Sequence, residues 1–125
     1  MTRRIGVLVL VGIAIQGAAF AWVYGDLIYL RRPVATLVRS GPDPFVRHAT
    51  RALERPRLTR GHLETIAQVA QTFRLAHLEV TALERHAAMD PRDRRIALRF
   101  AEALRRQGDM VRAERIYRNL AEAKP

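Results

Sequence analysis

The sequence predicts an all-α protein in which an N-terminal transmembrane helix precedes a small helical-hairpin domain of about five helices. An apolar run without any charge extends over residues 5–24. From residue 44 onward, apolar residues recur at helical spacing, and no stretch alternates as a strand would. Capping residues and chain breakers divide this second region into helix-sized pieces. We therefore expect an anchor over 1–30, a linker or interfacial segment over 31–43 and a helical domain over 44–125.

The apolar run has the length that a membrane-spanning helix needs. A helix rises about 1.5 Å per residue, so roughly 20 apolar residues cross the ~30 Å hydrocarbon core. Trp22, Tyr24 and Tyr29 cluster near its end, where amphipathic rings prefer the interface, and Arg31-Arg32 follow them. The sequence thus predicts a single-pass protein of the membrane.

A cleaved signal peptide is the alternative interpretation of this segment. Arg3 and Arg4 would form its basic region, and Ala19-Phe20-Ala21 its cleavage site. Because the sequence retains Met1, we favour an uncleaved anchor. The arginine bias of the chain is typical of GC-rich bacterial genomes. We expect the bacterial inner (cytoplasmic) membrane as its location. The export-signal-like start favours a domain in the periplasm. A cytoplasmic domain is the alternative, because arginines flank both ends of the run.

Small residues recur every fourth position within the anchor, at Gly17, Ala21 and Gly25. This spacing places them on one stripe, where another helix could approach closely. The stripe is a candidate packing face, and chance recurrence of common small residues is an equally good interpretation.

The region after residue 43 divides into five expected helices. Its boundaries are set by proline, glycine and capping residues such as Pro56, Thr59, Asp90 and Gly108. The expected helices are 44–55, 60–74, 77–89, one from about 90 to 107 and one from 109 onward.

The last two helices carry the most specific pattern in the sequence. The spacing from Pro91 to Pro125 matches the period of a common helix-turn-helix repeat, about 34 residues. The pattern residues between and including these prolines are Pro91, Ala97, Ala101, Leu104, Gly108, Ala113, Tyr117 and Pro125. This stretch resembles the tetratricopeptide repeat (TPR), with 91–125 as its clearest copy. The resemblance implies a domain that binds proteins.

The same register projected backwards gives a degenerate copy over 57–91. Leu63, Ala67 and Ala70 fit it, but Arg74 replaces the turn glycine and Glu79 replaces a small residue. An ordinary helical bundle with similar caps is the alternative. Because such repeats bury a continuous core only by stacking, we expect the open end or the concave face to be completed by another protein.

The residues give no case for an enzyme, a cofactor or a metal site. The chain lacks cysteine, and His48, His62, His77 and His86 lack metal-ligand spacing. The carboxylate pair Asp90 and Asp93 is explained by helix capping. We find no phosphate loop or hydrolase motif, and expect no small-molecule substrate.

The net charge of +10 comes almost entirely from arginine. A stripe on the last two helices is a candidate basic surface, formed by Arg92, Arg95, Arg99, Arg106, Arg112 and Arg115. It suits acidic protein or lipid headgroups, and a solvated face laced with glutamates is the alternative. Nucleic acid is not expected, because the basic residues are scattered and aromatic residues are few.

From the sequence we therefore expect a non-catalytic, membrane-anchored scaffold, accessory or assembly subunit. Its expected partners are membrane lipid and other subunits of a membrane protein complex. The alternative function is an arginine-rich electrostatic tether to anionic lipid or acidic surfaces, which salt would release.

Overall fold

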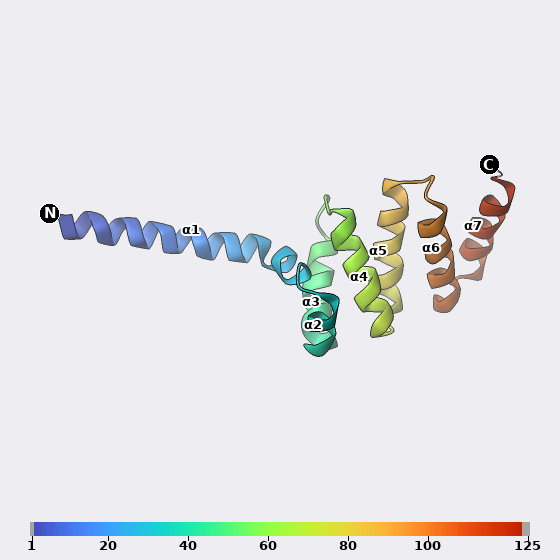
Figure 1. Ribbon diagram of the computed structural model, residues 1–125, viewed down its shortest axis with the longest axis horizontal. Helices are drawn as coiled ribbons and strands as arrows, with labels where there is room; N and C mark the ends of the chain where they lie inside the picture. The colour runs from blue at the N-terminus through green and yellow to red at the C-terminus, as the bar shows by residue number, and fades with distance from the viewer. Residues whose placement is uncertain (1, 124–125) are drawn as a thin grey trace.

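Every residue from 2 to 122 lies in a helix or a short connection, and no strand occurs in the part of the chain that the computed structural model describes (Figure 1). The structure describes residues 2–123, apart from the side chains of residues 2 and 17–23. The helices are α1 Thr2–Leu30, α2 Val34–Arg39, α3 Pro42–Leu53, α4 Arg60–Thr72, α5 Ala76–Met89, α6 Arg94–Gln107 and α7 Met110–Glu122. The all-α prediction is therefore confirmed for these residues.

Helices α3 to α7 stand side by side in a row, and α1 projects away from one end of it (Figure 1). Consecutive helices run in opposite directions, with α4 against α5, α5 against α6 and α6 against α7. The core between them is made of leucine, isoleucine and phenylalanine together with small alanines. Its fully buried large side chains include Leu37, Phe45, Leu63, Ile66, Leu83 and Leu104.

Side-chain caps fix the start of three helices. The hydroxyl of Thr59 accepts from the backbone N–H of His62 at α4, and the carboxylate of Asp109 accepts from that of Arg112 at α7. At α6 the cap is Asp93, which accepts from the N–H groups of the next helical turn. The helix expected to begin behind Asp90 therefore starts three residues later, because Asp93 supplies these bonds.

In the second half of the chain, the helices recur at a fixed spacing in the sequence. This repeat period equals the separation between residues 60 and 94. Helices α4 and α6 begin at these two positions, Arg60 and Arg94, and α5 and α7 begin one period apart at Ala76 and Met110. The turns inside the two hairpins match as well. The N–H of Leu75 donates to Ala70 O at 2.8 Å, and one period later that of Asp109 donates to Leu104 O at 2.9 Å. The hairpins α4–α5 and α6–α7 are thus repeats of one structural unit.

The last turn of α1 belongs to the core of the helical domain. Tyr29 and Leu30 are buried, and Asp26 contacts His48 of α3, with 2.7 Å between Oδ1 and Nδ1. In the segment expected to be a linker, Leu37 of α2 is also buried. Residues before 31 therefore contribute to the domain directly.

The prediction of an N-terminal transmembrane helix is wrong for the residues that the structure describes. Among them, no helix is both long enough and apolar enough to cross a membrane. Helix α1 carries Asp26 before its end, and its last turn, with Tyr29 and Leu30, is buried in the helical domain. The predictions of a single-pass protein, of an inner-membrane location and of a periplasmic domain depended on this helix, and they are withdrawn with it.

The proposed packing stripe receives no partner in this structure where it can be followed. A Cβ added at Gly25 would meet nothing within 4 Å, so open space surrounds it. Gly17 and Ala21 lie outside the residues whose side chains are described. The apolar side chains of the first half of α1, such as Ile5 and Leu8, are largely exposed.

Candidate binding sites on the helical stack

The row of helices has two edges with different chemistry (Figure 1). The turns within the hairpins, α4–α5 and α6–α7, lie at the lower edge. The α3–α4 and α5–α6 connections and the end of α7 lie at the upper edge. A charged pocket opens near the lower edge, and two mainly apolar grooves open near the upper edge.

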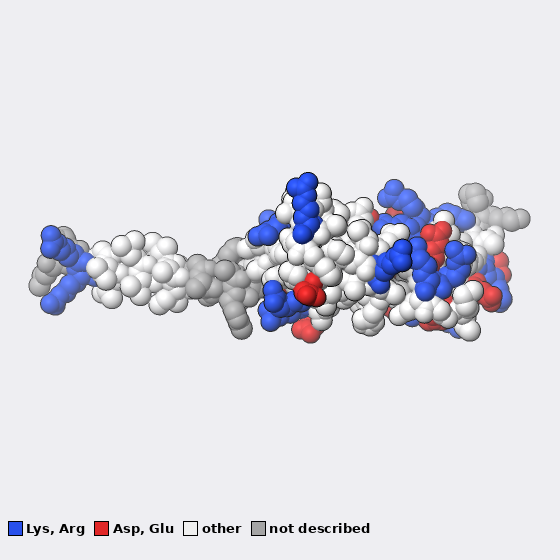
Figure 2. All heavy atoms as spheres, turned by 90° about the horizontal axis from the view of Figure 1, so that it is seen from below, with Lys and Arg blue, Asp and Glu red and all other residues white. Residues whose placement is uncertain are grey.

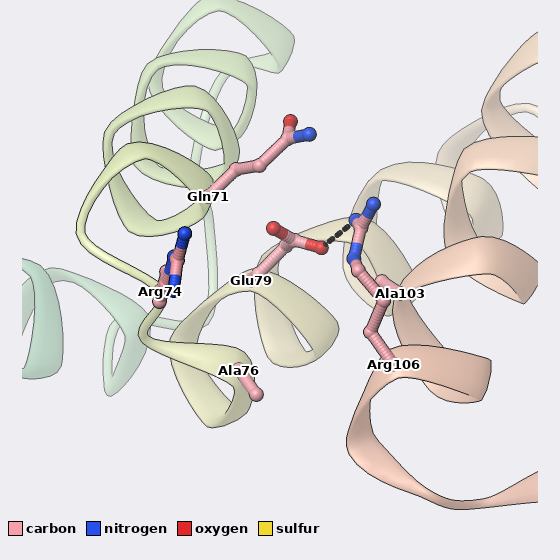
Figure 3. Close-up of a pocket in the computed structure, with 6 residues that line it drawn as sticks. All are labelled: Gln71, Arg74, Ala76, Glu79, Ala103 and Arg106. Carbon is pink, nitrogen blue, oxygen red and sulfur yellow. Dashed lines mark hydrogen bonds and ion pairs between the residues drawn. The ribbon is translucent and has the colours of Figure 1, made fainter.

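The charged pocket, here called the turn pocket, has a volume of about 380 Å³. Its lining comes from the end of α4, the start of α5 and the end of α6 (Figure 3). The lining residues are Gln71, Arg74, Ala76, Glu79, Ala103 and Arg106. The turn pocket thus lies between the α4–α5 hairpin and the first helix of the α6–α7 hairpin.

A buried carboxylate forms the floor of the turn pocket. The side chain of Glu79 is 6% exposed, whereas that of its ion-pair partner Arg106 is 48% exposed. Nη2 of Arg106 donates to Oε1 of Glu79 across the space between α5 and α6 (Figure 3). The guanidinium of Arg74 has no ion-pair partner among the described residues, so two arginines and one glutamate give the pocket a charge of +1.

Both departures from the repeat pattern line this one pocket. Arg74 adopts a left-handed conformation with φ of 58°, at the position where the next hairpin has Gly108 with φ of 96°. This conformation costs a residue with a Cβ about 1 kcal/mol, which glycine avoids. Glu79 is buried where the next hairpin has buried Ala113. Positions that cost stability without helping the fold are candidates for function.

The larger upper groove, here called the α6–α7 groove, has a volume of about 670 Å³. Its lining is mainly apolar, from Pro91, Ala97, Ile116, Leu120 and Ala123, and its polar residues are Arg92, Arg94 and Asn119. Arg94 closes the end of α7, because its guanidinium donates to Ala123 O at 2.6 Å and to Leu120 O at 2.8 Å. Arg92 is exposed at the rim.

An equivalent groove of about 460 Å³, here called the α4–α5 groove, lies one repeat earlier. Most of its lining residues stand one repeat period before residues of the first groove. Arg57, Leu58, Leu63, Arg85 and Met89 correspond in this way to Pro91, Arg92, Ala97, Asn119 and Ala123. The upper edge therefore carries two related hollows at the spacing of the repeat.

The predicted arginine stripe divides into paired and unpaired members. Arg99 donates to both carboxylate oxygens of Glu64 on α4, at 2.7 and 2.8 Å, and Arg106 pairs with Glu79 as described. Arg112 lies 3.3 Å from a carboxylate oxygen of Glu84. Arg106 thus joins α6 to the adjacent α5, whereas Arg99 and Arg112 reach the next helix but one in the row. Arg92, Arg95 and Arg115 are the members without an ion-pair partner among the described residues.

Basic side chains cover several places on the lower side of the domain, with acidic ones interspersed both near the projecting helix and toward the C-terminal end (Figure 2). The first arginines of α1 form a separate basic group at the far end of the projecting helix. On this face, the basic side chains therefore form separate groups and not one continuous patch.

The histidines have individual surroundings, and no group of three or more metal-binding side chains occurs among the described residues. His48 stacks on Tyr29 with 4.2 Å between ring centroids. Nδ1 of His62 lies 2.6 Å from Oγ1 of Thr59. Burial and, second, the charge of Arg31 lower the pKa of His62 below its usual 6.5. Buried His86 lies 3.6 Å from Glu64.

The residues that define the repeat pattern lie partly in the core and partly at the surface. Ala101, Leu104 and Ala113 are buried between helices, and Gly108 forms the left-handed turn. Ala97 and Tyr117 are half-buried. Pro91 precedes α6 and lines the α6–α7 groove, while Pro125 lies outside the described residues.

Comparison with protein-family models, with curated proteins and with solved structures finds no match.

Sequence reasoning missed the pockets themselves. The two odd residues, Arg74 and Glu79, were visible as departures from the repeat, but their meeting in one pocket with Arg106 depends on how α6 packs on α5. Gln71 gave no signal at all. The repeat period was the signal that could have paired the two upper grooves.

Proposed function

We propose that this protein is a non-catalytic, TPR-like helical-repeat domain that binds a segment of a partner protein along its upper edge. The proposal is carried by one observation, the recurrence of a mainly apolar, arginine-rimmed groove at the repeat spacing. The matching hairpin bounds and turn bonds support the resemblance to tetratricopeptide repeats. The membrane anchor is not part of this proposal.

The chemistry of the α6–α7 groove favours a particular kind of segment. Its apolar lining gains about 25 cal/mol for each Å² that a partner side chain covers. Among the residues that the structure describes, no carboxylate lines the groove, and the exposed guanidinium of Arg92 stands at its rim. A segment with bulky apolar side chains and a nearby acidic residue would therefore fit it best.

The groove is a better docking place than the outer face of α7. On α5, which packs against both α4 and α6, Val80 is 6% exposed. The equivalent residue on α7 is Glu114, which is exposed and charged. Burying this carboxylate under another helix would require a partner for it. A partner therefore completes the stack at its edge and leaves the outer face of α7 in water.

The alternative function is an electrostatic tether to an anionic surface. Half of the arginine stripe is already engaged with glutamates of other helices, which leaves fewer cations for such a surface. Salt separates the two functions, because attraction between exposed charges is screened at high ionic strength whereas apolar contacts persist.

The test blocks the groove without disturbing the core. Asn119 and Arg118 are neighbouring exposed residues of α7, and only Asn119 lines the groove. We expect the Asn119→Trp variant to lose a partner that co-purifies with the wild-type chain and with the matched Arg118→Trp variant at about 0.5 M salt. If raised salt instead releases the bound proteins equally from the wild type and from both variants, the result would support the tether. Identical partners for both variants would contradict binding at the groove.

A further inference from the structure

We propose that the turn pocket is an anion site that binds a carboxylate group through Arg74 and Arg106. The turn pocket lies at the opposite edge from the α6–α7 groove. The anion-site proposal is therefore tested independently of the proposed function. The pocket leaves several of its hydrogen-bonding groups unused, and these groups define what it can bind.

Donors outnumber acceptors among these unused groups. One N–H of the Arg106 guanidinium is engaged, with Glu79, and the others have no partner among the described residues. The guanidinium of Arg74 and the amide of Gln71 also lack partners there. A guanidinium presents five N–H donors in a planar fork that matches a carboxylate. The pocket is therefore equipped to surround an acceptor.

Charge selects the kind of acceptor. Glu79 and Arg106 neutralise each other, and Arg74 leaves a charge of +1. One carboxylate group brings this to zero, and the second carboxylate of a larger ligand can stay in solvent outside the pocket. The volume of about 380 Å³ accommodates an acidic side chain or a small dicarboxylate, so the site does not require a particular source of the group.

Glu79 acts as a positioning residue in this site. Its carboxylate is buried on α5 and accepts from Arg106 of α6, so it holds the exposed guanidinium over the pocket (Figure 3). A buried glutamate where the repeat otherwise has alanine is costly for packing alone. Arg74 likewise accepts a left-handed backbone conformation that glycine would adopt without strain. Anion binding in the pocket would explain why the chain has these two residues in spite of their cost in stability.

The experiment follows backbone amide and arginine side-chain NMR signals of the full chain during titration with sodium succinate at constant ionic strength. A parallel titration uses a capped peptide, acetyl-Ala-Glu-Glu-Ala-amide, and further ones use chloride and inorganic phosphate. We expect saturable shifts confined to the α4–α5 turn and the end of α6 with either carboxylate probe. Tighter binding of succinate or of the peptide identifies the source of the group, and both results support the site.

Variants give the site its specificity test. Arg74→Gly introduces the residue that the next hairpin has, so it should fold, and it should weaken carboxylate binding about tenfold. Arg106→Gln should do the same. The matched control is Arg105→Gln, an exposed neighbour outside the pocket, which should leave binding unchanged. Glu79→Gln should strengthen binding, because it keeps a hydrogen bond to Arg106 and removes a negative charge.

Three outcomes would overturn the proposal. Shifts of equal size with chloride would show general screening of arginines. Phosphate bound more tightly than either carboxylate would assign the pocket to another anion. Equal loss in Arg105→Gln and Arg74→Gly would place the anion outside the pocket.

Discussion

The ion pair between Glu79 and Arg106 makes a sharp thermodynamic prediction. Removing Arg106 leaves a carboxylate that is 6% exposed without its partner. Breaking a buried pair costs about 3–5 kcal/mol, but the guanidinium is half exposed and the pocket admits water, so we expect about 2 kcal/mol for Arg106→Met. In a domain of this size, that lowers the melting temperature by about 10 °C.

Removing the glutamate should cost far less. Glu79→Ala removes the desolvation cost of a buried carboxylate, and it places alanine where the next hairpin buries Ala113. We expect its unfolding free energy to lie within about 1 kcal/mol of the wild type, and the double variant to match Glu79→Ala.

Urea unfolding followed by circular dichroism at 222 nm measures this cycle, with Arg105→Met as the control, expected to change stability by less than about 0.5 kcal/mol. A loss for Glu79→Ala as large as that for Arg106→Met would refute the reasoning. It would mean that the carboxylate stabilises the fold by itself.

Three further predictions follow from the backbone, the packing and the titration of the domain. Gly108→Ala should cost about 1 kcal/mol and Arg74→Gly should gain up to about 1 kcal/mol, because both residues are left-handed; urea midpoints that move together would contradict this. Ala101→Leu should cost about 1–3 kcal/mol, since Ala101 is fully buried between helices and the larger side chain overpacks the site; an unchanged melting temperature would count against that packing. Burial, and then Arg31, lowers the pKa of folded His62, so the unfolded chain binds more protons just below pH 6.5. Stability should therefore rise with pH up to about 6.5 and then level off, and His62→Gln should flatten this rise; a variant that retains the full slope would exclude His62 as its source.

The helices of the domain were predictable from the sequence because their signals are local. Caps such as Thr59 and Asp109, and the turn glycine Gly108, act within one helical turn. The start of α6 was misplaced because Asp90 and Asp93 both suit a cap, and only the hydrogen bonds decide between them. The repeat spacing of the hairpins was also visible in the sequence.

The sites and the role of the first helix were not predictable in this way. The apolar run suggested a membrane span, but Asp26, Tyr29 and Leu30 connect the end of α1 with the domain, and this depends on contacts with α3. The arginine stripe was identified by helical spacing alone. That spacing could not show that Arg99 pairs with Glu64, far away in sequence on another helix.

Binding of a protein segment in the α6–α7 groove is tested most directly by site-specific photo-crosslinking in cells. A benzophenone amino acid replaces Asn119 inside the groove or Arg118 beside it, both on the exposed surface of α7. We predict a discrete protein adduct from position 119 that is absent from position 118 and survives high salt. Equal adducts from the two positions, or none from position 119, would contradict binding in the groove.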